Sequence, residues 1–461
     1  MNKMEQHQLI PPTKHEIVID SIRRLLRRGA IGPISKIINK QHPADIAKSI
    51  SEVEKKDRFL LFELIQDVKA KAGAIVEVEE AIRMEMLNEM PIDDIVAILH
   101  EIPSDKAADI IGKMPEDKAK ELLNMMKAEN SKEVKGLLKF EEETAGGIMI
   151  PQFFALSENT TVQQAIKALQ KAKDVEMVFY IYVTDDKGRL VGVLSIRQLL
   201  LVPPRKQLKD IMVRDVISVT TDMDQEEVAR RVARYNILAI PVVDKENKLV
   251  GIITVDDIID VIKDEATEDI YKMAGLNIDE RALDPIFSSI RRRLPWLYIN
   301  LLTAILAASV VGLFTNTIQT FAILAAYMPI VAGMGGNAAT QTLTVIIRGM
   351  ALGELTFGNT MKALLKESSA GLINGIATGV AMGVIAYLWN GNYMLGVVVC
   401  LAMIINMFVA GLTGTLIPVI LRAFKIDPAV ASTVVVTTFT DVVGFFSFLG
   451  IATLLIHYIA V

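Results

Sequence analysis

The sequence predicts a multi-domain membrane protein with an all-α superhelical amino-terminal domain, a tandem pair of α/β domains and an α-helical transmembrane domain of five spans. The 461-residue chain is 51% hydrophobic, with a mean hydropathy of +0.38, which is too apolar for an ordinary soluble protein, yet 22% of its residues are charged. The charges are segregated, because residues 1–293 hold 50 of the 54 acidic and 44 of the 49 basic residues. The charged part contains internal repeats, and the remainder consists of long uncharged runs.

These changes in composition divide the chain into four parts. We expect a helical domain over residues 1–140, the α/β pair over 141–262, an acidic connecting helix over 263–290 and the transmembrane domain over 291–461. The acidic balance of the charged part argues against nucleic acid as a partner. The single cysteine, Cys400, excludes a disulfide framework. The stretch Met1–His7 lacks the apolar core of a signal peptide, so we expect the charged part to stay in the cytosol.

The amino-terminal domain contains a short repeat that opens on proline. Pro91, Pro103 and Pro115 are evenly spaced, and each precedes acidic residues and then an apolar run. Proline at the start of a helix loses no hydrogen bond, and acids there suit the helix dipole. Helices this short cannot bury a face alone, so we expect them to stack into a superhelix. Asp105 and Asp109 lie one turn apart on one face, either as a cation site or as a solvated helix start.

A longer repeat follows over residues 141–201 and 208–261. Each copy reads as strand, polar turn, strand and helix, with an amphipathic helix upstream. Both copies contain Leu-Val-Gly, two apolar residues and then a hydroxyl residue, which is Ser195 in the first copy and Thr254 in the second. The repeat resembles a tandem pair of CBS domains, and this resemblance implies an adenine nucleotide such as ATP as a candidate ligand. Thr254 and Asp257 match the Ser/Thr-x-x-Asp element of such domains, whereas the first copy has Gln198 in place of the aspartate.

A helix dense in acids is predicted just before the membrane part. Asp257, Asp260, Asp264 and Glu268 recur at three- and four-residue spacing and form one stripe. Like charges at this spacing destabilise a helix by roughly 0.2–0.5 kcal/mol per pair. Anionic lipid nearby would repel them further. Divalent cations would relieve the repulsion, which favours cation sensing, and a charged, solvated linker is the alternative.

Long uncharged runs predict five membrane spans. The run from Leu294 to Ile347 is long enough for two helices and breaks at Thr315–Thr320. The run from Ser368 to Leu421 is long enough for two more and breaks at Trp389–Tyr393, and a fifth helix is expected from Val430 to Ile459. All the charged loops fall on one side. We therefore expect a multi-pass protein of the plasma membrane with a cytoplasmic amino terminus and an extracellular carboxyl terminus.

The fifth span carries one acid, Asp441, with no base near it in the sequence. A carboxylate at bilayer depth normally faces a water-filled path or the bundle interior, so we interpret Asp441 as a cation site in a pore, with packing between helices as the alternative. In span two, Pro329 and the run Gly333–Gln341 are expected to disrupt regular helix and to offer oxygen ligands, with close packing through small residues as the alternative. Inter-helix hydrogen bonds are expected from Asn374, Asn406 and Thr413.

The candidate ligands are all oxygen atoms, because no histidine or cysteine cluster accompanies them. Oxygen ligands suit hard cations and not soft ones. Mg²⁺ keeps most of its water and is held by one or two carboxylates, so one aspartate contributed by each of two subunits would suit a hydrated Mg²⁺. The charge of the site also allows Ca²⁺ or Mn²⁺.

The whole chain resembles the MgtE family of magnesium channels. The resemblance is carried by Pro329 with Gly335-Gly336-Asn337 in span two, by Asp427-Pro428-Ala429 before span five, and by the run from Thr437 to Asp441 within it. One departure lies in span five, where Val434 stands in place of a proline that family members often carry. The resemblance implies a homodimer in the lipid bilayer, with a pore on its two-fold axis and Asp441 of both subunits holding hydrated Mg²⁺.

The resemblance also implies that cytosolic Mg²⁺ bridges the amino-terminal domain, the CBS pair and the connecting (plug) helix and so closes the pore. The bridging acids that it implies are Asp105, Asp109, Asp224, Glu226, Asp257, Asp260, Glu265, Glu268 and Asp269, with Asp427 near the gate. The hypothesis is a Mg²⁺ uptake channel that high cytosolic Mg²⁺ closes.

Other functions stay open at this point. One alternative is a CBS-regulated transporter of another ion, such as Mn²⁺, Co²⁺ or Ca²⁺, or an exporter or anion channel. Another is a membrane-anchored nucleotide sensor that transports nothing. An enzyme is not expected, because the sequence contains no nucleophile–base pair, no phosphate-binding Gly-x-x-x-x-Gly-Lys and no metal-hydrolase motif.

Overall fold

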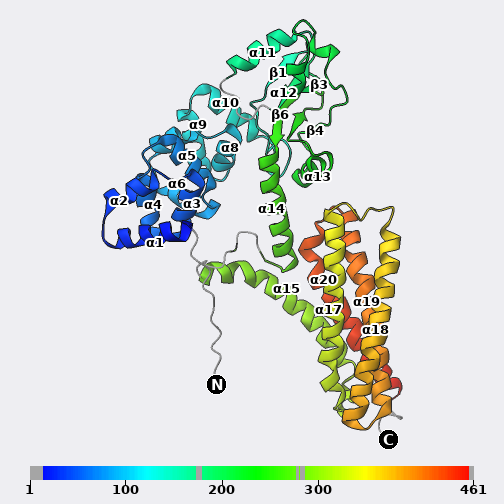
Figure 1. Cartoon of the computed structure of the whole chain (residues 1–461). Coiled ribbons are helices and arrows are strands. Elements are labelled where there is room, and N and C mark those ends of the chain that lie inside the picture. Colours follow the sequence, from blue (N-terminus) through cyan, green and yellow to red (C-terminus); the bar gives the residue numbers. More distant parts are fainter. Residues whose placement is uncertain (1–13, 173–178, 277–279, 281–285, 456–461) are drawn as a thin grey trace, which may run out of the picture. The chain divides into compact units, whose positions relative to one another are not determined.

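Figure 1 shows the computed structural model of the chain, coloured from the amino to the carboxyl end. It describes residues 14–172, 179–276, 280 and 286–455. The stretch Met1–His7, predicted to lack a signal peptide, and the predicted end of span five at Ile459 lie outside the described residues. The chain forms two compact units, Met1–Val261 (unit 1) and Ile262–Val461 (unit 2), each with a hydrophobic core of its own.

The first half of unit 1 is helical, as predicted. Its helices in the described part are α1 (Lys14–Arg27), α2 (Ile31–Ile38), α3 (Pro43–Glu52), α4 (Lys55–Glu63), α5 (Val68–Glu77), α6 (Glu80–Glu89), α7 (Ile92–Leu99), α8 (Ser104–Gly112), α9 (Glu116–Met125) and α10 (Ala128–Leu137). Helices α7, α8 and α9 begin directly after Pro91, Pro103 and Pro115, and each has acids in its first turn. The prediction of helices that open on proline is confirmed.

Alternate helices of this half pack side by side. Helix α3 packs on α5, α5 on α7, α7 on α9, and α8 on α10. They share one core, in which Ile50, Ile75 and Leu99 are almost completely buried. Helices of eight to ten residues are marginal alone, so each is stabilised by the apolar faces of its neighbours. This stacking is what the proline-opened repeat predicts.

The second half of unit 1 contains two α/β copies with the same order of elements. The first is β1 (Ala155–Ser157), α11 (Val162–Lys171), β2 (Tyr180–Thr184), β3 (Leu190–Ser195) and α12 (Ile196–Leu201), and the second, after the short helix η1 (Leu208–Asp210), is β4 (Val219–Thr220), α13 (Gln225–Tyr235), β5 (Ala239–Val243), β6 (Leu249–Thr254) and α14 (Val255–Met273). In each copy the first strand pairs parallel with the second, and the second antiparallel with the third. The predicted repeat is confirmed, but β1 and β4 were not predicted, because two or three residues are too few for a pattern.

The described part of unit 2 contains the predicted five helices that are long and apolar enough to cross a membrane. They are α15 (Ile286–Gly312), α17 (Leu324–Ala351), α18 (Thr360–Asn390), α19 (Tyr393–Ala423) and α20 (Pro428–Leu454). The stretch Thr315–Thr320, predicted as a break between the first two spans, forms a short helix, α16. Helix α15 begins eight residues before the predicted Leu294, so it includes Arg291, Arg292 and Arg293.

Helix α17 continues without interruption through Pro329 and the run Gly333–Gln341, so the prediction of disrupted helix is wrong. The glycines serve close packing instead. A side chain at Gly335 would collide with Asn406 of α19. Asn406 Nδ2 donates a 2.8 Å hydrogen bond to the Val331 carbonyl, so a polar contact between helices takes the place of the expected open backbone.

Helices α18 and α19 approach each other through glycine. Gly371, Gly375, Gly379 and Gly383 lie four residues apart, so they form one stripe along α18. A Cβ atom at Gly379 would lie 2.8 Å from the Cys400 carbonyl oxygen, and one at Gly383 would lie 2.7 Å from that of Gly396. No larger residue fits at this approach. Membrane helices gain little from the hydrophobic effect, so close contact through small residues stabilises the bundle.

Candidate cation sites

One acidic cluster lies in unit 1, where α8 meets the start of α14. Lys106 Nζ lies 2.8 Å from Asp257 Oδ1 and 4.0 Å from Asp105 Oδ2. Asp257 Oδ2 accepts a 3.0 Å hydrogen bond from Thr254 Oγ1. Asp105 is only 3% exposed, and its Oδ1 has no hydrogen-bond partner among the described residues. The structure therefore brings together the predicted residues Asp105 and Asp257 and adds Lys106, which sequence reasoning missed.

Burial dominates the electrostatics of this cluster. Burial raises the pKa of Asp105 to about 6, against the opposing effect of Lys106 and with a further rise from Asp257. Burial also raises the pKa of Asp109, which is partly buried one turn along α8. Burial would lower the pKa of Lys106, but Asp257 outweighs it, and that pKa lies above its ordinary value. A solvated helix start, the alternative considered for these two acids, is wrong for the buried Asp105.

Two further predicted acids of unit 1, Asp224 and Glu226, have local contacts. Asp224 caps helix α13, because its Oδ1 accepts a 2.9 Å hydrogen bond from the Glu226 amide. Glu226 forms an ion pair with Arg230, one turn further along, at 3.8 Å. Asp260 is exposed on α14. Cation binding by Asp224, Glu226 and Asp260 stays a prediction.

A second acidic cluster lies in unit 2, between the end of α14 and the start of α20. Lys272 forms one ion pair with Glu268 on its own helix and another, at 2.7 Å, with Asp427 Oδ2. Asp427 also caps α20, because its Oδ1 accepts a 2.8 Å hydrogen bond from the Ala429 amide. Burial raises the pKa of Asp269, and Asp427 adds to the rise. An ammonium again lies among acids that the family resemblance assigns to Mg²⁺.

Asp441 lies on α20 and lines a cavity of 250 Å³ within unit 2. The wall of the cavity comes from the end of α14, from α15 and from α20, through Met273, Ala274, Trp296, Asn300, Thr303, Ala304, Thr433, Val434, Thr437, Thr438 and Asp441. Asp441 is the one carboxylate among these residues. Within the part of the chain that the structure describes, no hydrogen bond or ion pair reaches it.

The threonine hydroxyls of this wall donate to backbone carbonyls. Thr433 Oγ1 donates to the Met273 carbonyl at 2.8 Å and so joins α20 to the end of α14. Thr437 and Thr438 donate to carbonyls one turn earlier on their own helix, at 2.9 and 2.6 Å. A hydroxyl that donates its hydrogen keeps its oxygen lone pairs as acceptors. The wall therefore combines one carboxylate with neutral oxygen atoms, which suits a hydrated hard cation.

Other polar residues of the spans do not join this site. The candidate ligands of span two, Asn337, Thr340 and Gln341, are exposed on the surface of unit 2. The inter-helix hydrogen bond predicted for Asn406 is confirmed. Thr413 donates instead to the Val409 carbonyl of its own helix, so that prediction is wrong, and Asn374 is exposed.

The described residues form no cluster of acidic, histidine or cysteine side chains that would enclose a metal ion. Residues 14–172, 179–276, 280 and 286–455 contain no group of three or more His, Cys, Asp or Glu side chains placed to hold a metal. Glu265 is partly buried on α14, between Asp257 and Glu268 in sequence. Each candidate site presents few carboxylates, as expected for a cation that keeps much of its water.

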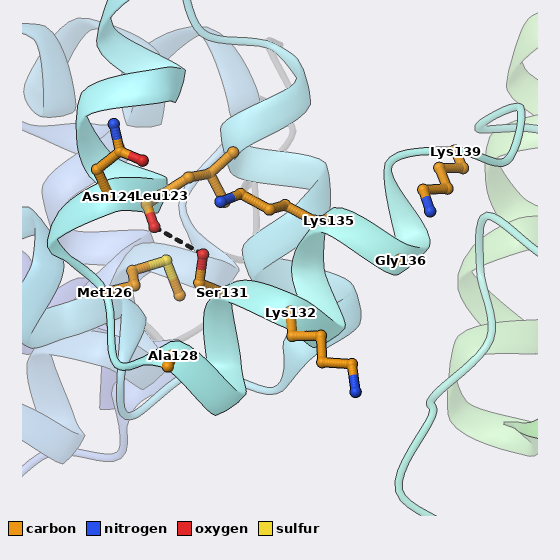
Figure 2. Close-up of a pocket in the computed structure, with 9 residues that line it drawn as sticks. All are labelled: Leu123, Asn124, Met126, Ala128, Ser131, Lys132, Lys135, Gly136 and Lys139. Carbon is orange, nitrogen blue, oxygen red and sulfur yellow. Dashed lines mark hydrogen bonds between the residues drawn. The ribbon is translucent and has the colours of Figure 1, made fainter.

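A larger cavity, of 570 Å³, lies beside α9 and α10 in unit 1 (Figure 2). Lys132, Lys135 and Lys139 line it, and Ser131 Oγ donates a 2.6 Å hydrogen bond to the Leu123 carbonyl. The nine described residues that line it include no acid, so it offers a cation no carboxylate. The sequence did not predict this cavity.

Known protein families match three parts of the chain. The family model of the MgtE intracellular N domain matches residues 41–143, and that of the CBS domain matches 145–204 and 208–264. The family model MgtE, described as a divalent cation transporter, matches residues 328–451. These matches correspond to the helical half of unit 1, to its two α/β copies and to the last four spans.

Similar proteins cover most of the chain. The magnesium transporter MgtE of Bacillus subtilis is 34% identical over 436 residues, which are 94% of this chain and 96% of that protein. The magnesium transporter MgtE of Thermus thermophilus is 39% identical over 69% of this chain and 71% of its own length. A crystal structure of the cytosolic domain of the Mg²⁺ channel MgtE in complex with ATP is 35% identical, with a TM-score of 0.50, over 53% of this chain and 99% of that one. The chain therefore belongs to the MgtE family.

Proposed function

We propose that this chain transports Mg²⁺ across the membrane and that its cytosolic domains regulate the transport. Its relatives from Bacillus subtilis and Thermus thermophilus are named magnesium transporters. The observation that carries the proposal is Asp441, the one carboxylate among the residues that line the 250 Å³ cavity of the membrane unit, where no cation of the described chain reaches it. A partly buried acid of this kind in a membrane unit must take its positive charge from solution.

Asp441 is the proposed permeation site. One carboxylate balances half the charge of Mg²⁺, so a homodimer that contributes Asp441 twice around a two-fold axis would suit the ion. Thr437 and Thr438 would contact its water shell through their oxygen atoms. The membrane potential favours inward flow by about 4.6 kcal/mol per 100 mV for a divalent ion, so uptake needs no further energy source.

Regulation is proposed to act through α14. The proposed division is a helical domain (1–140), a CBS pair (141–262), a connecting helix (263–290) and a pore domain (291–461). Helix α14 starts earlier than the expected connecting helix, at Val255, and ends at Met273, and we propose that it links sensing to permeation. Its end forms part of the cavity wall, where the Met273 carbonyl accepts the hydrogen bond from Thr433. The acids proposed to bridge the domains through Mg²⁺ are Asp105, Asp109, Asp224, Glu226, Asp257, Asp260, Glu265, Glu268 and Asp269, with Asp427 near the gate.

The proposed location is the plasma membrane, with a cytoplasmic amino terminus and an extracellular carboxyl terminus. The last turns of α17 and α19 and the connections that follow them carry charges, among them Arg348, Glu354, Arg422 and Lys425. The connections on the opposite side, 313–323 and 391–392, carry none. Basic residues favour the cytoplasmic side. Catalytic activity is not expected of this chain.

A second candidate function is ATP binding by the CBS pair. It is favoured by the ATP complex of the related cytosolic domain and by the Thr254–Asp257 element. Titration of the purified wild-type chain and of Asp257→Ala with ATP tests this second function. If Asp257→Ala binds ATP as tightly as the wild type, the Thr254–Asp257 element is not part of the ATP site.

Mg²⁺ uptake by the reconstituted chain tests the main proposal. Vesicles that contain the chain and a Mg²⁺-sensitive dye should take up Mg²⁺ when the interior is made negative. Ca²⁺, Mn²⁺ and Co²⁺ added in competition measure selectivity among divalent ions. Uptake no faster than in empty vesicles would overturn the proposal, and equal uptake of all four ions would replace it with a general divalent cation transporter.

A further inference from the structure

The acidic cluster of unit 1 contains a cation of its own. Lys106 Nζ lies 2.8 Å from Asp257 Oδ1 and 4.0 Å from Asp105 Oδ2. We propose that Lys106 is a tethered counter-ion, which holds α8 to the start of α14 when Mg²⁺ is scarce and makes this contact less dependent on Mg²⁺. The inference rests on the proposed function only where it assigns the competing cation to Mg²⁺.

The pair differs from an ordinary surface ion pair, which contributes little because both partners stay in water. The Asp257 side chain is 9% exposed, and Thr254 Oγ1 fixes its second oxygen by a hydrogen bond. The Lys106 side chain is 34% exposed, so water can reach it but does not surround it. A buried carboxylate that loses its partner is strongly destabilising. Lys106 therefore stabilises this junction between α8 and α14.

The charge of the cluster supports the same role. Asp105 and Asp257 would together place two negative charges on the facing helices, and Asp257 disfavours the ionised form of Asp105. Lys106 balances one of the two charges. Asp109 has other basic neighbours, Lys113 and Arg83, besides Lys106. Without Lys106, Asp105 and Asp257 would repel each other until a cation from solution came between them.

Lys106 and a divalent cation compete for the same acceptor. Asp257 Oδ1 accepts from the ammonium, and Oδ2 accepts from Thr254. A divalent cation that approaches Oδ1 therefore meets the positive charge of Lys106, and the two cations repel each other. Asp105 Oδ1, which is buried without a hydrogen-bond partner in the described chain, lies in the same cluster. Lys106 thus makes the structural change at the junction of α8 and α14 smaller when Mg²⁺ binds, because the two helices are already in contact before the ion arrives.

Hydrogen–deuterium exchange of the full-length chain, in EDTA and in saturating Mg²⁺, tests this inference. In Lys106→Met, exchange of the peptides that cover α8 should rise about tenfold in EDTA, because a charge-assisted hydrogen bond to a buried acid is lost. Saturating Mg²⁺ should bring it back to the wild-type rate. Lys106→Arg keeps the charge and should stay within about twofold of the wild type in EDTA.

A matched control removes a different ammonium from the same domain. Lys120 forms an exposed ion pair with Glu116 on α9, so Lys120→Met should leave α8 unchanged. Equal exchange of wild type and Lys106→Met in EDTA overturns the inference. Faster exchange throughout unit 1, including α3 and α5, also overturns it, because Lys106 would then be a residue of general stability.

The same experiment separates this inference from the proposed function. Because Lys106 should keep the change at α8 small in the wild type, the comparison of EDTA with Mg²⁺ in Lys106→Met tests whether Mg²⁺ acts on this junction. The comparison of wild type with Lys106→Met in EDTA tests the tethered counter-ion without any Mg²⁺. Failure of the first with success of the second removes Mg²⁺ sensing and leaves Lys106 in its role.

Discussion

Two acidic sites of this molecule differ in the source of their positive charge. In unit 1, Asp257 pairs with Lys106 at 2.8 Å and accepts a hydrogen bond from Thr254. In unit 2, Asp441 faces a cavity of 250 Å³, and no ion pair or hydrogen bond reaches it from the described residues. An acid with a built-in counter-ion can form a stable contact, whereas an acid without one must draw its cation from solution.

The difference agrees with the proposed roles of the two sites, one in regulation and one in transport. A permeating ion must bind weakly enough to leave again, so its site cannot contain a tethered competitor. A regulatory contact has a different need, because it must respond to the cation without separating completely when the cation is scarce. The cluster around Lys272 resembles that of unit 1 in this respect, since its ammonium pairs with both Glu268 and Asp427.

The largest effect is expected from Asp441→Asn. The substitution keeps the size of the side chain and removes its charge. Mg²⁺ uptake into vesicles should therefore fall by at least about tenfold, as expected when the one charge-balancing group of the cavity is lost. The control is Glu354→Gln, which removes an exposed acid from the same unit and should leave uptake unchanged. Size-exclusion chromatography would show whether both variants fold. A folded Asp441→Asn chain with wild-type uptake contradicts the permeation site.

A smaller effect, on gating alone, is expected from neutralising the acids of α14. The variant replaces Asp257, Asp260, Glu265 and Glu268 by their amides. Its Mg²⁺ uptake at high internal Mg²⁺ should stay within about twofold of the rate at low Mg²⁺, because the ion would no longer favour the closed state. Uptake at low Mg²⁺ should match the wild type, since Asp441 is intact.

The control for this variant removes the same number of charges elsewhere. The exposed acids Glu116, Glu121, Glu129 and Glu246 of unit 1 are suitable. Their amides should leave closure by Mg²⁺ intact. If the α14 variant also closes normally, the acids of α14 do not sense Mg²⁺, and the comparison between a regulatory and a permeating site no longer holds.

Asp105→Asn should change stability in a pH-dependent way. The pKa of Asp105 is raised to about 6 in the folded chain, so the wild type loses stability as pH rises from about 4 to about 6. The amide avoids this loss. In EDTA, Asp105→Asn should therefore raise the free energy of unfolding of unit 1 by about 1–3 kcal/mol at pH 8 and by little at pH 4.

Exchange of α7 and α8 amides in the full chain would measure this gain. Asp215→Asn, at an exposed acid of unit 1, is the control and should give no gain. A variant no more stable than the wild type at pH 8 would mean that Lys106 compensates Asp105 fully. In Mg²⁺ the order should reverse if Asp105 binds the ion, because only the carboxylate gains from it.

Much of this architecture could be predicted from local sequence, and the least predictable part is the pairing of charges. Long uncharged runs predicted the five spans, and the repeated Leu-Val-Gly motif predicted both α/β copies. The prediction that Pro329 disrupts helix α17 was wrong, because Asn406, which supplies a hydrogen bond and packing there, lies on another helix and is not visible in the local sequence. Lys106 and Asp257 lie 151 residues apart in sequence, so the role of this lysine emerges only from the fold.

The smallest effect is expected at Gln198, which occupies in the first α/β copy the position of Asp257 in the second. Gln198 is exposed, and its Oε1 accepts hydrogen bonds from the Ser195 amide and hydroxyl at 3.0 and 3.2 Å, which caps α12. An aspartate here would still suit the start of the helix, so Gln198→Asp should change the free energy of unfolding by less than about 1 kcal/mol. It should also leave closure by Mg²⁺ unchanged. A shift in the Mg²⁺ dependence of uptake would contradict this prediction. An exposed acid without a lysine partner would then sense Mg²⁺. The pairing of Asp257 with Lys106 would then not be what distinguishes the second α/β copy from the first.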